Sequence, residues 1–115
     1  PYPFQISRDR VTEEQAEVSF LLPNHPLMQQ PNKLSNSDFN GWVQELGLYF
    51  PNKWDEKYQA LFAANDLNES PKKGLLLTTS YGKGTFIYSG LSFFRQLPAG
   101  VPGAYKLIAN MISSK

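Results

Sequence analysis

The strongest constraint on the fold is a pair of strand-like segments separated by a glycine-containing turn. Residues 74–81 (GLLLTTSY) and 85–89 (TFIYS) flank the sequence GKG at positions 82–84. Glycine supplies the positive φ angle that a tight reversal needs, and β-branched and aromatic residues favour the extended flanks. The pattern predicts a β-hairpin.

An uninterrupted apolar run at residues 75–77 of this hairpin predicts a strand that is covered on both faces. Such a strand requires a layered domain, and we expect helices to form the covering layers. One helix is expected at the end of the chain, where Pro102 suits the first helical position. An apolar stripe at helical spacing follows it and should lie on the sheet: Ala104, Leu107, Ile108 and Met111.

The rest of the chain gives weaker signals. Extended segments are expected at residues 2–7, 17–22, 42–45 and 59–64. The Ala content of the last of these makes helix the alternative there. Residues 51–53 and 65–73 are expected to interrupt the strands.

A Pro- and Asn-rich stretch at residues 23–36 predicts a long loop, with at most one helical turn at residues 27–30. A loop of that length is often functional or supported by a partner.

These elements predict an α/β fold, or α+β for an isolated fragment, with a mainly antiparallel or mixed sheet and a C-terminal helix packed on it. The chain has 115 residues, of which 41% are apolar and 18% charged, as in one globular domain. We therefore treat residues 1–115 as a single domain or a domain fragment. The sequence starts at Pro1 without an initiator Met, and no apolar run is long enough to cross a bilayer, which indicates a piece of a larger protein.

Charge and composition exclude several kinds of site. Eleven basic and ten acidic residues leave a net charge of +1, without the basic cluster that binds nucleic acid. The absence of Cys excludes disulfides, thiol nucleophiles and thiolate metal sites but leaves the compartment open. The sequence has a single His, His25, so a metal site built from several His residues is excluded. In its Pro-rich turn we expect His25 to act as a local cap rather than as a base.

Two groups of residues are candidates for a carbohydrate site. Trp42 lies near Glu45, and Trp54 is followed by Asp55 and Glu56. An indole face can stack on a sugar ring while carboxylates bind its hydroxyl groups, but glycosidase carboxylates must face each other across a cleft. Packing of the two indoles in the core or at an interface is the favoured alternative.

An anion site is a further candidate at the start of the last helix. Arg95 precedes this helix, whose free N–H groups and dipole could bind a carboxylate or phosphate. A structural ion pair or a contact with a carbonyl is the favoured alternative for Arg95.

Five segments resemble a known family: residues 38–45 (DFNGWVQE), 47–50 (GLYF), 54–56 (WDE), 81–84 (YGKG) and 93–105 (FFRQLPAGVPGAY). They are similar to the C-terminal region of large bacterial PIG-L (LmbE-like) deacetylases, especially of the Bacteroidetes type. The likeness spans nearly the whole chain and is strongest from Trp42 onward.

This resemblance implies a parent protein in which an N-terminal zinc-dependent domain removes acetyl groups from N-acetylglucosamine-type substrates. The C-terminal region of such proteins looks like a flavodoxin-like module of the class I glutamine-amidotransferase type. The deacetylase's His-Pro-Asp-Asp metal motif has no match, because Leu27 and Met28 follow His25 and Pro26, and the amidotransferase Cys is missing too. We therefore expect no cofactor in this piece and zinc in the parent.

Three functions remain open. The resemblance implies a non-catalytic accessory module, structural or glycan-binding, whose partner is the remainder of a parent chain that is compatible with a periplasmic or secreted location. A hydrolase or amidotransferase-like enzyme that uses Glu45, Asp55 or Glu56 is the alternative. An oligomerisation or docking module is the third, because so many aromatic residues could leave an apolar patch exposed.

Overall fold

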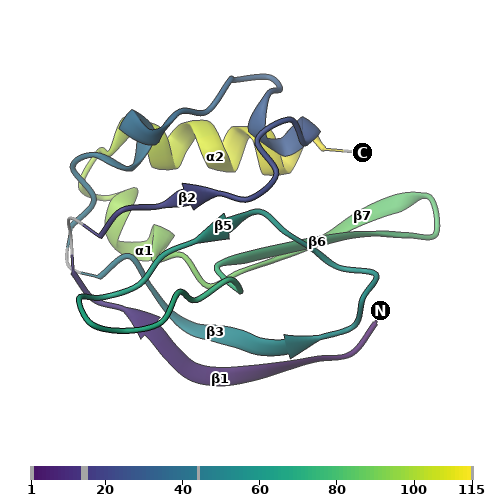
Figure 1. Ribbon diagram of the computed structural model, residues 1–115. Coiled ribbons are helices and arrows are strands. Elements are labelled where there is room, and N and C mark those ends of the chain that lie inside the picture. The colour runs from purple at the N-terminus through teal and green to yellow at the C-terminus, as the bar shows by residue number, and fades with distance from the viewer. Residues whose placement is uncertain (1, 14–15, 44, 115) are drawn as a thin grey trace.

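The arrangement combines three small antiparallel sheets with a C-terminal helix (Figure 1). The computed structural model describes residues 2–13, 16–43 and 45–114. Its elements are β1 (Phe4–Val11), β2 (Ser19–Phe20), η1 (Pro26–Met28), η2 (Asn36–Phe39), β3 (Gly47–Trp54), β4 (Gln59–Ala60), β5 (Phe62–Ala63), β6 (Leu76–Tyr81), β7 (Gly84–Ser89), α1 (Phe93–Gln96) and α2 (Pro102–Ser113).

The predicted hairpin is confirmed as β6 and β7. These strands pair in continuous register from Leu76 opposite Ser89 to Tyr81 opposite Gly84. The turn has two central residues, and Gly82 in the first of them has a φ of +59°. Type II′ hairpin turns require glycine at this position, so the local sequence alone determines the reversal.

Every strand pair of the described residues is antiparallel. The strands form three sheets, namely the pair β1–β3, the pair β2–β5 and the triplet β4–β6–β7. The Leu48 N–H donates to Gly90 O at 2.9 Å and the Gly90 N–H donates to Leu75 O at 3.0 Å, which joins β3 to the hairpin. The fold is therefore α+β with antiparallel sheets.

The segment expected at residues 59–64 is extended, as predicted, but it forms two short strands. β4 pairs with β6 on one side, and β5 pairs with β2 on the other. Leu61 lies between them, donates its N–H to Leu76 O at 3.2 Å and accepts the Leu21 N–H at 2.9 Å. Because the segment exchanges partners at Leu61, neither strand is long. The strand expected at residues 17–22 is likewise reduced to β2.

The prediction of a strand at residues 42–45 is wrong. Residues 42, 43 and 45 lie outside any strand, and Gln44 lies outside the described residues. β3 starts at Gly47 instead and runs through residues 51–53, which were expected to interrupt it. Its pairing with β1 shifts register three times, and Tyr49 has a φ of +56°. These irregularities remove the alternation by which a strand is recognised in a sequence. β1 is longer than the strand expected at residues 2–7.

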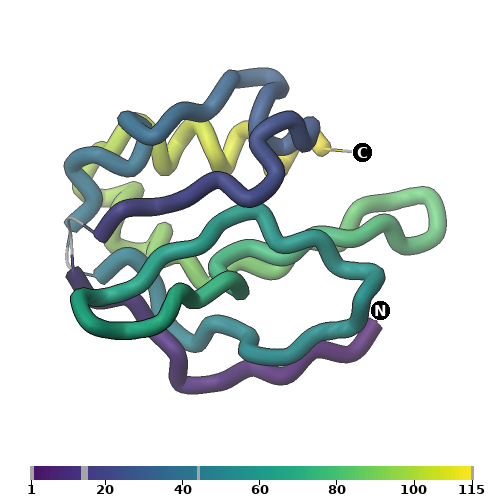
Figure 2. Tube along the Cα trace, in the orientation of Figure 1, coloured from purple at the N-terminus to yellow at the C-terminus, as the bar shows by residue number. Residues whose placement is uncertain are grey.

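The loop at residues 23–36 is supported by α2. It contains η1, a single turn near the position predicted, and Leu27 and Met28 of this turn are buried. The Asn110 side chain of α2 donates to Leu27 O at 2.8 Å and to Asn32 O at 2.7 Å, and accepts the Asn32 N–H at 3.0 Å. Figure 2 shows this part of the chain running along α2. The loop therefore has its support within the chain.

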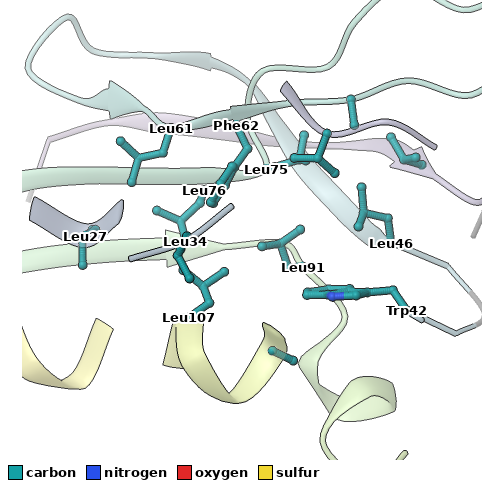
Figure 3. Close-up of a cluster of buried hydrophobic side chains, with 14 of the residues drawn as sticks. Leu27, Leu34, Trp42, Leu46, Leu61, Phe62, Leu75, Leu76, Leu91 and Leu107 are labelled. Carbon is teal, nitrogen blue, oxygen red and sulfur yellow. The ribbon is translucent and has the colours of Figure 1, made fainter. Parts of the chain in front are cut away.

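The predicted C-terminal helix is confirmed, with Pro102 in its first turn. Ala104 and Leu107 are buried, and Met111 packs against the core. Ile108 is only half-buried, whereas Asn110 is fully buried. Figure 3 shows Leu107 directed at the leucines of the sheet and of the loop.

Residues 75–77 are fully buried, so the expected cover on both faces is confirmed. The expectation that helices provide it on both faces is wrong. Leu77 pairs with Tyr88, so the two side chains share a face. The Phe4 ring of β1 lies 5.0 Å from the Tyr88 ring, between ring centroids. Aromatic side chains from the start of the chain therefore cover this face.

Candidate functional site

The five candidate ligand residues do not form one site. Glu45 lies just before β3, and Trp54 is its last residue. An extended chain rises about 3.3 Å per residue, so the eight residues of β3 extend over roughly 25 Å and keep Glu45 and Trp54 at opposite ends of the strand. Trp42 and Arg95 belong to the first end, and Asp55 belongs to the second.

Trp42 is a core residue. Its side chain is 3% exposed, and its Nε1–H donates to Asp38 O at 3.0 Å. Its ring packs against those of Phe39 and Phe93, with centroids 5.1 and 6.0 Å away. Figure 3 shows it beside Leu91 in the hydrophobic cluster. The indole face is therefore not open for stacking on a ligand.

Glu45 and Arg95 form an ion pair. The Arg95 Nε donates to Glu45 Oε1 at 2.9 Å. The guanidinium also lies over the Phe94 ring, 5.0 Å from its centroid. The structural ion pair, which was the favoured alternative for Arg95, is confirmed. A ligand anion would have to compete with the Glu45 carboxylate for this guanidinium.

Asp55 organises a turn. Its Oδ1 accepts the Lys57 N–H at 2.9 Å, and its own N–H donates to Pro3 O at 3.0 Å. Glu56 beside it is exposed. Trp54 is half-buried and borders a hollow of about 250 Å³ together with Lys72.

His25 is the N-terminal cap of η1, as the sequence predicts. Its Nδ1 accepts the Leu27 N–H at 3.1 Å, and its Nε2 lies 3.0 Å from Gln59 Oε1. A ring nitrogen that accepts a hydrogen bond carries no proton, so the neutral ring has its proton on Nε2. The Nε2–H then donates a hydrogen bond to Gln59 Oε1. The imidazole thereby links the loop to β4.

A cavity of about 480 Å³ lies beside this imidazole, and we call it the neutral pocket. It lies between η1, the hairpin and the end of α2, so several segments distant in the sequence form its walls. The described lining residues are His25, Pro26, Leu27, Gln30, Gln59, Thr78, Thr79, Ser80, Thr85, Asn110, Ser113 and Ser114. None of these carries a carboxylate, an ammonium or a guanidinium group.

A second hollow of about 380 Å³, the apolar pocket, adjoins the first. The two share His25, Pro26 and Gln59. Leu21 and Leu22, each 37% exposed, supply most of the remaining apolar wall. Sequence reasoning missed both pockets, because no local motif marks residues that meet only through the fold.

The described part of the chain contains no group of three or more His, Asp or Glu side chains placed to hold a metal ion. None of its helices is long and apolar enough to cross a membrane. No protein-family model, no curated protein and no solved structure matches the chain.

Proposed function

We propose that the chain is a non-catalytic accessory module that supports or positions the hydrolase domain of a LmbE-like (PIG-L) deacetylase. The resemblance of residues 38–45 and 93–105 to that family motivates the proposal. The zinc chemistry would belong to the parent's N-terminal domain, and the remainder of the parent chain would be the partner.

The observation that carries the non-catalytic part is the placement of the carboxylates. Glu45 is paired with Arg95 at 2.9 Å, and Asp55 holds a turn through the Lys57 N–H at 2.9 Å. Catalytic carboxylates of glycosidases face one another at about 5–10 Å across a cleft. Glu45 and Asp55 flank opposite ends of β3, an arrangement unlike the facing carboxylates of a glycosidase, and this supports the proposal.

The finer fold proposal is that this sheet and α2 complete a flavodoxin-like module of the class I glutamine-amidotransferase type. Such modules are built on a parallel sheet with helices on both faces. The described strands pair antiparallel. Under this proposal the parallel strands belong to the rest of the parent chain.

Assays of carboxylate variants test the proposal. Glu45→Gln, Asp55→Asn and Glu56→Gln are made one at a time in the full parent, and deacetylation and glycoside hydrolysis are measured. We expect kcat/KM to stay within about threefold of wild type, because losing a structural contact lowers stability rather than transition-state binding. A loss of orders of magnitude in a folded variant would establish the enzyme alternative.

Docking is the second candidate function. Phe94 of α1 and Tyr105 of α2 are 63% and 51% exposed. The Tyr105 hydroxyl donates to Leu97 O, which ties α2 to the end of α1. Large exposed aromatic side chains are typical of interface anchors. Sedimentation of the chain alone, and mixed with the rest of its parent, distinguishes self-association from docking.

A further inference from the structure

The neutral pocket has the size of a small-molecule site. Its volume of about 480 Å³ falls within the range of roughly 300–1,000 Å³ that ligand pockets occupy. The polar groups converge on it from separate elements, namely η1, β4, the hairpin and α2. This convergence requires the complete fold.

The walls of the pocket are held in place by contacts within the chain. The His25 imidazole caps η1 through the Leu27 N–H, and Asn110 donates to Leu27 O at 2.8 Å. Asn110 is fully buried, so its contacts are shielded from water. A ligand that binds a preformed pocket loses little binding free energy to the ordering of protein side chains and loops.

The pocket presents hydrogen-bonding groups of both kinds. Gln59 Oε1 is engaged by the His25 Nε2–H, which leaves the Gln59 Nε2 as a donor without an acceptor among the described residues. Ser80 and Ser113 are exposed at the pocket, and each hydroxyl both donates and accepts. These groups match a ligand with several hydroxyl or amide groups.

Charge restricts the ligand further. No charged side chain lies among the described lining residues. The C-terminal end of α2, with Ser113 and Ser114, contributes the negative end of the helix dipole. A bound anion would lose hydration without gaining a cation from the lining residues that the structure describes, whereas a neutral ligand loses far less.

We propose that the neutral pocket binds an uncharged small molecule with several hydroxyl or amide groups, and that a short apolar substituent of this ligand occupies the apolar pocket. The two pockets meet at His25, Pro26 and Gln59, so one molecule can reach both. The inference rests on the cavity and not on the proposed family, so either can fail without the other.

An NMR titration of the full chain with three probes tests the proposal. Glucose should give saturable shifts of the Gln59, Ser80 and Ser113 amides. Hexyl glucoside should bind roughly tenfold more tightly, because its chain would be buried at Leu21 and Leu22. Glucuronate should bind at least roughly tenfold more weakly than glucose, because it is an anion. Equal affinity for glucose and glucuronate would overturn the charge argument.

A pair of neighbouring variants provides the control. Ser113→Tyr places a ring in the neutral pocket and should abolish the shifts, while Ile112→Tyr should keep them, because Ile112 is 79% exposed and does not line the pocket. Ser80→Tyr on β6 fills the pocket from the other side and should act like Ser113→Tyr. The proposal is wrong if wild type shows no saturable shift with either neutral probe, or if both filling variants bind as wild type does.

Discussion

Gly103 allows α2 to approach η2 more closely than any other residue would. A Cβ at this position would lie 2.6 Å from the Asp38 Cα and still closer to the Asp38 carbonyl. Two further contacts converge on Asp38, one from α2 and one from the residues that follow η2. The Lys106 Nζ lies 3.0 Å from Asp38 Oδ1, and Trp42 donates to Asp38 O at 3.0 Å. The absence of a side chain at residue 103 therefore allows the last helix to pack directly against the middle of the chain.

Gly103→Ala should destabilise the protein by about 2–4 kcal/mol, because the α2–η2 contact must open. In a helix with room for the methyl group, the same change would stabilise by about 1 kcal/mol. Urea unfolding gives the sign directly, and Ile112→Ala, on the exposed face of α2, should change stability by less than about 0.5 kcal/mol. A Gly103→Ala variant as stable as wild type would show that α2 does not pack this closely.

Asp66 makes the free energy of unfolding depend on pH in the acid range. Burial alone would raise the pKa of Asp66, but hydrogen bonds from the Glu13 and Thr12 N–H groups and the Thr12 hydroxyl, together with the Arg10 charge, lower it below 3.8. A lowered pKa in the folded state stabilises the fold above the ordinary value and loses this contribution as the pH falls through the folded-state pKa.

Asp66→Asn should therefore cost stability at about pH 5 and cost less at about pH 2, because the wild-type contribution is lost as the pH falls toward and through the folded-state pKa of the carboxyl. Unfolding free energies of both proteins, measured by urea titration at the two pH values, give this difference. An equal cost at both pH values would mean that the carboxylate charge does not stabilise the fold.

The Gln96 side chain, in the four-residue helix α1, makes the backbone hydrogen bonds that a neighbouring strand would otherwise make. Its side chain accepts the Val43 N–H at 2.8 Å and donates to Val43 O at 2.9 Å. The hydroxyl of Ser92, the residue just before this helix, donates to the carbonyls of Glu45 and Leu46. Side chains thus satisfy a backbone segment that was expected to pair as a strand.

Replacing Gln96 with Leu should destabilise the protein by about 2–4 kcal/mol, because both Val43 backbone groups lose the partner that the fully buried Gln96 side chain provides. Hydrogen exchange at the Val43 amide should accelerate at the same time. Phe94→Leu, on the exposed side of α1, is the control and should leave exchange at Val43 unchanged. Unchanged protection of Val43 in Gln96→Leu would show that another group holds this segment.

At the scale of elements, the sequence predicts those structures whose signals are local. The hairpin depends on Gly82, and the last helix depends on Pro102 and its apolar spacing. β3 could not be predicted, because a positive φ at Tyr49 and three register shifts disrupt its alternation. Helices on both faces of the sheet were expected from burial alone, but burial does not indicate which element provides the cover.

At the scale of the whole molecule, the pockets could not be predicted. The capping role of His25 follows from its turn and is confirmed. Its proximity to Gln59, Ser80 and Ser113 depends on how the loop, the hairpin and α2 come together. The candidate carbohydrate residues failed to converge for the same reason, since β3 separates Glu45 from Trp54. Spacing in a sequence says little about distance across a sheet.

The most direct test of the non-catalytic role compares rate with stability in one protein. The triple variant Glu45→Gln, Asp55→Asn, Glu56→Gln is made in the full parent, and kcat/KM for deacetylation is measured beside the unfolding temperature. Our account predicts a lower unfolding temperature, since the contacts of Glu45 and Asp55 are lost, with kcat/KM within about threefold of wild type. An unchanged unfolding temperature with kcat/KM reduced by about a hundredfold or more would contradict it.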